Sequence, residues 1–197
     1  KPAGTTSLVL GTSSGIHAWH NKYYIRRMRV GKNEPIYSYL SKNHPELIQD
    51  EYFRPHDTAV IEIPQAAPKG SIVRTESAFD LLERVKRVAT DWVATGHKTG
   101  SNTHNVSATI SLKEKDWEPA GEWMWKNRNT YNGLSVLPYD GGTYTQAPFE
   151  DITKAKYDEM TKTLQEIDLT KVIENTDNTD LSGELACAGG SCEITGL

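Results

Sequence analysis

The order of patterns in residues 77–140 restricts the fold more than any other feature of the sequence. Residues 77–96 repeat apolar side chains at helical spacing, and residues 104–112 (HNVSATISL) alternate between apolar and polar. Residues 116–128 form a second helical pattern, and residues 131–140 form a second apolar strand. The order helix, strand, helix, strand predicts an α/β fold with a parallel sheet or barrel.

Details of this region sharpen the prediction. Gly96 suits the end of the first helix, Asp116 is a candidate cap for the second, and Pro138 interrupts the last strand. We interpret the tryptophans of the second helix as packing residues. The apolar positions of the first helix and the three tryptophans are Phe79, Leu82, Val85, Ala89, Trp92, Val93, Trp117, Trp123 and Trp125.

The alternating strand has one apolar face and one small polar face, which is typical of a strand that lines a barrel or a site. The apolar face carries Val106, Ala108, Ile110 and Leu112, and the polar face Ser107, Thr109 and Ser111.

The flanking segments also predict regular elements. Residues 23–30 and 58–65 are predicted strands, the second ending at Pro64. Residues 33–43 are a predicted short helix capped by Asn33, and residues 151–167 are a predicted final helix.

Composition narrows the class of protein. The chain has 197 residues, enough for one domain, with 37% hydrophobic residues, 24% charged residues and a net charge of −4. We therefore expect neither nucleic acid nor a membrane as partner. The start shows no secretory signal, and two cysteines do not indicate a disulfide scaffold, so we expect a cytoplasmic protein.

The character of the sequence changes near Ile173. We expect residues 1–173 to form the folded part and residues 174–197 to form a flexible polar tail. The tail carries the only cysteines, Cys187 and Cys192, with Ala-Gly-Gly-Ser between them.

The cysteine pair has two interpretations. The two glycines between Cys187 and Cys192 allow the sulfurs to approach, but so small a loop gains little stability from a disulfide. Zinc needs more ligands than this segment offers. A reversible dithiol on a mobile arm, working by thiol–disulfide exchange, is one hypothesis, and a pair of inert thiols in a disordered end is the other.

The opening segment PAGTTS, residues 2–7, is a candidate anion site. Gly4 allows close backbone approach, and Thr5, Thr6 and Ser7 supply hydroxyls before an apolar run. An ordinary helix cap explains the same residues. A phosphate loop of this kind follows a strand, which would precede Lys1, so we expect the chain to be a piece of a longer polypeptide.

Two further segments are weaker candidates. The basic aromatic stretch 20–29 could contact phosphate, although a solvated strand face explains it better. Residues 100–105 could present Asn102, His104 and Asn105 to a ligand, and a plain turn is the alternative. We identify no metal cluster and no serine–histidine–aspartate arrangement in the sequence.

Several blocks in register resemble the C-terminal part of the catalytic chain of ribonucleotide reductase, most of all the adenosylcobalamin-dependent class II. The blocks are KPAGTTSLVLGTSSGIHAW, YYIRRMRVG, GHKTGSNTHNVSATI, YNGLSVLPYDGGTYTQAPFEDIT and CAGGSCEI. The resemblance implies the last strands and helices of a ten-stranded α/β barrel of the glycyl-radical-enzyme type, followed by the flexible tail.

The resemblance also assigns roles. It implies that Ala3, Gly4, Thr5, Thr6 and Ser7 bind the phosphates of a ribonucleotide substrate. It implies that Cys187 and Cys192 reduce the active-site disulfide formed in each turnover and are themselves reduced by thioredoxin or a similar protein.

The implied reaction replaces the ribose 2′-OH by hydrogen, using a thiyl radical on a cysteine that lies upstream in the family. This chain has no cysteine before Cys187, so we expect it to need the N-terminal remainder of the enzyme for turnover. Class I enzymes carry a stacked tyrosine pair where this chain reads SVLPYD, which favours class II. The alternatives are a class I catalytic subunit and a non-catalytic nucleotide-binding or thioredoxin-docking module.

Overall fold

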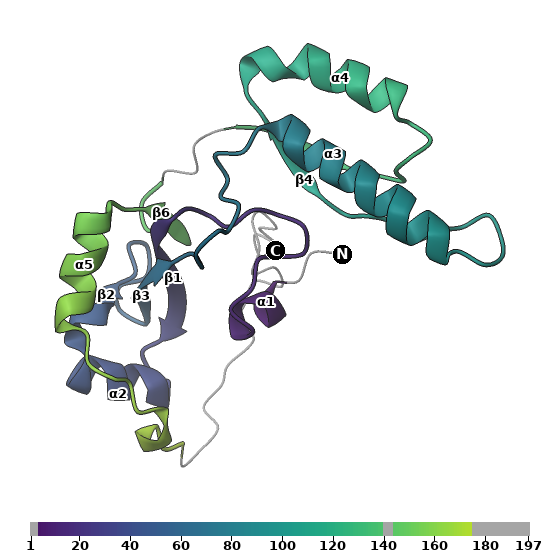
Figure 1. The fold of residues 1–197 in the computed structure, drawn as a ribbon. Coiled ribbons are helices and arrows are strands. Elements are labelled where there is room, and N and C mark those ends of the chain that lie inside the picture. Colours follow the sequence, from purple (N-terminus) through teal and green to yellow (C-terminus); the bar gives the residue numbers. More distant parts are fainter. Residues whose placement is uncertain (1–3, 140–143, 175–197) are drawn as a thin grey trace, which may run out of the picture. The chain divides into compact units, whose positions relative to one another are not determined.

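A computed structural model describes residues 4–139 and 144–174 of the chain (Figure 1). The chain divides into two compact units. Unit 1 comprises residues 1–22 and 66–143, and unit 2 comprises residues 23–65 and 144–197. Each unit is therefore built from two separate stretches of the sequence.

Unit 1 contains the predicted order of helices and strands. Its elements are α1 (Thr5–Val9), α3 (Ala78–Val88), the π-helical turn η2 (Ala89–Ala94), β4 (Thr109–Leu112), the 3₁₀ turn η3 (Glu114–Asp116), α4 (Trp117–Lys126) and β5 (Ser135–Pro138). Strands β4 and β5 pair in parallel, with Thr109 opposite Ser135 and Leu112 opposite Pro138. The β4–α4–β5 segment is thus a parallel strand–helix–strand unit, as predicted.

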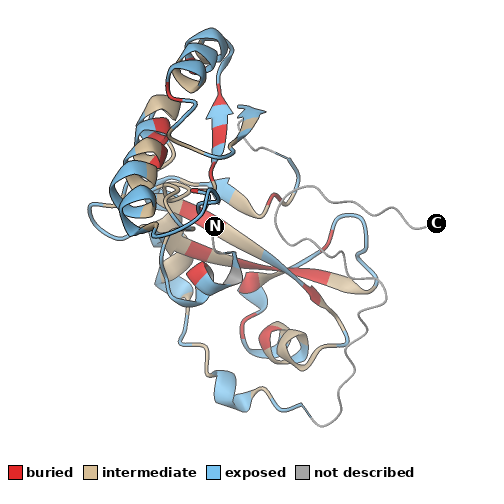
Figure 2. Ribbon diagram, turned by 90° about the vertical axis from the view of Figure 1, so that its right-hand side faces the viewer, coloured by how far each residue is buried: buried red, intermediate tan, exposed pale blue. Residues whose placement is uncertain are grey.

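The core of unit 1 lies between α3, α4 and β4 (Figure 2). The predicted apolar face of the strand segment is confirmed as buried, and Thr109 and Ser111 on the other face are exposed. Leu82 and Ile110, each 1% exposed, lie at the centre of the cluster. Its buried members are Leu81, Leu82, Val85, Val106, Ala108, Ile110, Leu112 and Ala120.

Helix α3 begins with a capping box. The Ser77 hydroxyl accepts a hydrogen bond from the Asp80 N–H, and the Asp80 carboxylate accepts one from the Ser77 N–H. These bonds satisfy amides that have no partner within the helix. Asp116 was expected to cap α4 but accepts from the Lys113 N–H instead, at 3.3 Å. That bond closes the short turn η3.

The predicted helix over residues 77–96 is confirmed as one helical segment that ends at Gly96, but its hydrogen bonding changes to the π-helical turn at Ala89–Ala94. Within this turn Ala89 and Val93 pack against the core as predicted, whereas Trp92 is 79% exposed. Of the three tryptophans expected to pack, Trp123 lies against the core, whereas Trp117 and Trp125 are exposed.

Unit 2 is built around a four-stranded sheet. The predicted strands at residues 23–30 and 58–65 are confirmed as two of its members, whereas the antiparallel arrangement was not predicted. Its elements are β1 (Tyr23–Gly31), α2 (Pro35–Asn43), the 3₁₀ turn η1 (Pro45–Leu47), β2 (Ile48–Asp50), β3 (Thr58–Ala66), β6 (Phe149–Asp151), α5 (Lys154–Thr163) and the 3₁₀ turn η4 (Leu169–Lys171). The strand order is β2-β3-β1-β6, with β2–β3 and β1–β6 antiparallel.

Strands β1 and β3 are antiparallel as well, because backbone hydrogen bonds join opposite ends of the two strands. The Lys32 N–H donates to the Asp57 carbonyl, and the Ala67 N–H donates to the Lys22 carbonyl. The whole sheet of unit 2 is therefore antiparallel, in contrast to the strand pair of unit 1.

Apolar residues from α2, β1 and β3 form the core of unit 2; Val30, Leu40, Ala59 and Ile61 are its buried members. Three local expectations for this unit are wrong. The cap position of α2 is Glu34 rather than Asn33, and the Glu34 carboxylate accepts from the Gly31 N–H. Strand β3 continues through Pro64 to Ala66. The final helix is shorter than predicted, beginning after a Thr153 cap.

Candidate functional site

The candidate anion segment forms a short helix with a well-defined end. The Ser7 hydroxyl donates to the Gly4 carbonyl at 2.7 Å, and the Thr12 N–H donates to the Ser7 carbonyl at 2.9 Å. Gly11 has a φ of +59°, the left-handed conformation that this type of helix end requires. Residues 4–12 are thus fixed by their own backbone.

The residues proposed to bind phosphate have different environments. Ser7 is 6% exposed and its proton is committed to Gly4, so its role in this segment is to hold the loop. Thr6 is exposed, and a Cβ added at Gly4 would meet no atom within 4 Å. The backbone at Gly4 and the Thr6 hydroxyl are therefore accessible to a ligand. Thr5 begins the helix, and Ala3 lies outside the described residues.

The segment that follows α1 borders a pocket of about 260 Å³ within unit 1. The residues lining it are Ser13, Gly15, Ile16, His17, Ala18, Trp19, Ser71, Ile72 and Arg84. Backbone bonds at 2.9 Å from Trp19 N–H to Ile72 carbonyl and from Arg74 N–H to Trp19 carbonyl fix one wall.

His17 has both ring nitrogens engaged. Its Nε2 accepts from the Thr109 N–H at 3.0 Å, and its Nδ1 lies 2.9 Å from the Ser14 carbonyl. A nitrogen that accepts an N–H cannot carry a proton, so Nδ1 is the donor to the Ser14 carbonyl. His17 thereby joins the segment after α1 to the start of β4.

Arg84 of α3 supplies the second anchor of this segment. Its Nη1 donates to the Ile16 carbonyl at 2.9 Å, and its Nη2 forms an ion pair with Glu76 at 2.5 Å. The hydrogen bond that Arg84 donates to the Glu76 carboxylate raises the pKa of Arg84 above its ordinary value, and burial opposes this rise. No local pattern in the sequence indicates the bond between Arg84 and Ile16, because the two residues are 68 positions apart.

The weaker candidate at residues 100–105 joins two loops. The Asn105 side-chain oxygen accepts from the Gly133 N–H at 3.2 Å, and the Asn132 amide donates to the carbonyls of Thr103 and His104. These bonds favour the turn interpretation. Asn102 is exposed in the same loop.

The basic stretch 20–29 is not a simple solvated face. Arg27 is buried in ion pairs with Glu62 and Glu150, and Arg29 pairs with Glu51 at 3.2 Å.

The described residues contain no group of histidine, cysteine, aspartate and glutamate side chains arranged for a metal ion. No helix in residues 4–139 and 144–174 is both long and apolar enough to cross a membrane. Cys187 and Cys192 lie outside the described residues.

Comparisons with known proteins cover nearly the whole chain. No family model matches it. The chain is 28% identical over 198 residues to the adenosylcobalamin-dependent ribonucleoside-triphosphate reductase of Lactobacillus acidophilus, covering 98% of this chain and 26% of that protein. It is 31% identical over 176 residues to the enzyme of the same name from Euglena gracilis, covering 84% of this chain and 22% of that protein.

A solved structure of a related enzyme matches the fold of this chain. The crystal structure of a B12-dependent (class II) ribonucleotide reductase matches with a TM-score of 0.66 and 23% identity, over 82% of this chain and 22% of that one. The chain spans about a quarter of the length of the curated relatives it matches. Over that quarter of their length, the chain is a homologue of the adenosylcobalamin-dependent ribonucleotide reductases.

Proposed function

We propose that the chain works as the C-terminal part of an adenosylcobalamin-dependent ribonucleoside-triphosphate reductase. One observation carries this proposal: relatives with that name align with 98% of the chain. They do not favour the class I alternative, because each is named for its dependence on adenosylcobalamin. The reaction would convert a ribonucleoside triphosphate and a dithiol into the 2′-deoxyribonucleotide, water and a disulfide.

Residues 3–7 would bind the substrate phosphates. Support comes from the accessible backbone at Gly4 and the exposed Thr6 hydroxyl at the start of α1, where backbone N–H groups favour an anion. Ser7 would act by holding the loop in shape through its bond to Gly4. Ala3 and Thr5 join this site on the family resemblance alone.

We propose further that the folded part of the chain belongs to a ten-stranded α/β barrel. Parallel sheets are normally covered on both faces, whereas β4 and β5 expose Thr109, Ser111 and Leu137. Further parallel strands of a longer polypeptide would complete such a sheet. The boundary between residues 1–173 and the tail 174–197 also stays a prediction.

The pocket beside His17 does not fit the cofactor. The pocket beside His17, at about 260 Å³, is below the range of about 300–1,000 Å³ that holds drug-sized ligands, and a corrin ring is larger still. His17 is also engaged at both nitrogens. We therefore assign adenosylcobalamin to the remainder of the enzyme and route no step through it here.

Cys187 and Cys192 would carry electrons between an outside reductant and the active site. One tail thiolate would attack the active-site disulfide, forming a mixed disulfide and releasing one active-site thiolate. The other tail thiolate would then attack the tail sulfur of the mixed disulfide, which closes the tail disulfide and releases the second active-site thiolate. Thioredoxin or a similar dithiol protein would then reduce the tail, consistent with a cytoplasmic enzyme.

The phosphate site is testable on the 197-residue chain by titration with a ribonucleoside triphosphate followed by ³¹P NMR. We expect Gly4→Val to weaken binding at least tenfold, because its side chain would block the backbone amides without a clash inside the fold. Gly121→Ala, at another exposed glycine with open space, is the matched control. Equal binding by Gly4→Val and the parent would show that residues 3–7 do not bind the phosphates.

The dithiol is tested by alkylation and mass spectrometry before and after thioredoxin and its reductase are added. We expect one internal disulfide that thioredoxin reduces. Thiols that never pair would favour the non-catalytic module instead. Turnover by the chain without the remainder of the enzyme would contradict the proposed division of labour.

A further inference from the structure

Three arginines in four residues of β1 have different surroundings. Arg27 and Arg29 project from one face of the strand, and both bind carboxylates. Arg27 pairs at 2.5 Å with Glu62 and with Glu150, and it also donates to the Ala147 carbonyl. On this face, therefore, each guanidinium has its own counter-ion.

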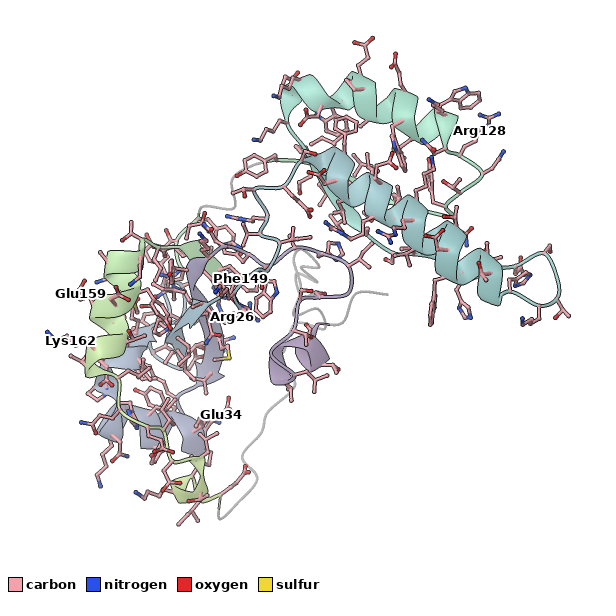
Figure 3. All side chains as sticks on the ribbon, viewed as in Figure 1. Arg26, Glu34, Arg128, Phe149, Glu159 and Lys162 are labelled. Carbon is pink, nitrogen blue, oxygen red and sulfur yellow. The ribbon has the colours of Figure 1, made fainter. Side chains whose placement is uncertain are left out.

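Arg26 projects from the opposite face, and no carboxylate in the described part of the chain serves as its counter-ion. Its guanidinium lies 4.3 Å from the centroid of the Phe149 ring, on the neighbouring strand β6 (Figure 3). Its Nε is buried and has no hydrogen-bond partner among the residues that the structure describes. Across residues 4–139 and 144–174, no carboxylate forms an ion pair with Arg26.

An unpaired, half-buried guanidinium costs free energy, since burial disfavours its charge. Burial lowers the pKa of Arg26 below its ordinary value, with a smaller opposing effect from Tyr24. Arg128 of unit 1 provides a comparison. It also stacks on an aromatic ring, that of Trp125 at 4.6 Å, but this tryptophan is 72% exposed and Arg128 donates to its carbonyl.

The surroundings of Arg26 indicate the chemistry of its missing partner. Its neighbours on the same strand face are Tyr24, which is buried, and Met28, which is 41% exposed. Aromatic residues, methionine and arginine together are typical of the centre of a protein interface. A phosphate carries more charge and normally takes several donors, whereas one guanidinium in apolar surroundings matches one carboxylate.

We propose that Arg26 anchors a docking surface, made by Tyr24, Arg26, Met28 and Phe149, for a polypeptide segment that presents a single carboxylate. The segment comes from the remainder of the longer reductase, because the matched relatives are about four times the length of this chain. Only the source of the segment rests on the proposed function. The chemistry of the surface rests on the residues described above.

The first test measures thermal unfolding of the 197-residue chain without any partner. Arg26→Met removes a charge that has no counter-ion while keeping apolar contact with Phe149, so we expect Tm to rise by about 2–4 °C. Arg128→Met, the matched stacked arginine, is expected to change Tm by less than about 1 °C. A fall in Tm for Arg26→Met would show that the stacked arginine is structural and would overturn the proposal.

The second test identifies the anion, using sodium propionate and inorganic phosphate at matched ionic strength. NMR of ¹⁵N-arginine Nε–H groups should show a saturable shift of the Arg26 resonance with propionate and none at Arg128. A stronger response to phosphate than to propionate would indicate that Arg26 binds a phosphate rather than a polypeptide carboxylate, and this would overturn the proposal. No response to either anion would also overturn it. Neither test uses a nucleotide, so failure here is distinguishable from failure of the reductase assignment.

Discussion

In unit 1 the buried cluster between α3, α4 and β4 is entirely aliphatic, whereas unit 2 buries charged groups in its sheet. The buried glutamates, Glu51 and Glu62, both belong to unit 2, and each binds an arginine of β1. Aliphatic burial tolerates changes of shape that conserve volume, but a buried charge depends on one particular partner. The two units should therefore respond to substitution in different ways.

The sharpest way to break this comparison is Arg27→Met. It leaves Glu62 buried without a counter-ion, so we expect unit 2 to lose about 3–5 kcal/mol of its free energy of unfolding. Amide hydrogen exchange of peptides from β1 and β3 would measure the loss. The double variant Arg27→Met/Glu62→Leu should recover much of it, because no charge then stays unpaired.

All five tryptophans lie in unit 1, which provides the control for this experiment. Tryptophan fluorescence during urea unfolding should be nearly the same for Arg27→Met and the parent. If the fluorescence transition moves together with exchange in β1, the units unfold as one cooperative body and the comparison fails.

Leu82→Ala is the corresponding test of unit 1. Leu82 is 1% exposed at the centre of the aliphatic cluster, and its truncation should cost about 2–5 kcal/mol, depending on how far the cavity collapses. Tryptophan fluorescence should report the full shift. Leu82→Met, which nearly conserves volume, should cost less than about 1.5 kcal/mol, and an equal loss from both variants would contradict aliphatic packing as the cause.

The buried carboxylate of Glu51 gives unit 2 a pH dependence that the aliphatic cluster lacks. Burial raises the pKa of Glu51, but bonds from the Arg54 and Phe53 N–H groups and from Arg29 outweigh it and hold the pKa below its ordinary value. The stabilisation is therefore complete above the unfolded-state pKa of about 4.3 and is lost as pH falls through the lower folded-state value.

Glu51→Gln isolates this contribution. We expect a loss of about 1–3 kcal/mol in unit 2 at pH 7 and a smaller difference between variant and parent as the pH falls below about 4. Hydrogen exchange of residues 51–58 across that range is the measurement. A difference that stays constant with pH would mean that the side chain acts through shape rather than charge.

The same contrast explains which parts of the fold could be predicted. The alternation Val106, Ala108, Ile110, Leu112 is a local signal, because one face of the segment is buried and the other is not. In unit 2 the partners of Arg27 lie 35 and 123 residues away, and β6 has only three residues. Nothing near Arg27 in the sequence indicates those partners, so the antiparallel sheet escaped prediction.

The candidate site also has a part that could be predicted from local sequence and a part that could not. Residues 2–7 are contiguous, so their small and hydroxyl side chains could be recognised as a possible anion segment, and the resemblance assigned them a role. The anchors behind that segment could not be found, because His17 meets Thr109 and Arg84 meets Ile16 only through the fold. Helix capping is again local, and it gives the smallest of the expected effects.

Ser77→Ala and Thr153→Ala compare equivalent caps in the two units. Each hydroxyl accepts a backbone N–H three residues later, and either substitution should cost its helix about 0.5–2 kcal/mol. Helix α3 buries Leu81, Leu82 and Val85, whereas α5 buries none of its residues. The loss at Ser77 should therefore appear in the global unfolding of unit 1, because packing prevents α3 from fraying alone. The loss at Thr153 should appear as faster exchange confined to the first turn of α5. Equal behaviour of the two variants would show that core packing does not decide how each helix opens.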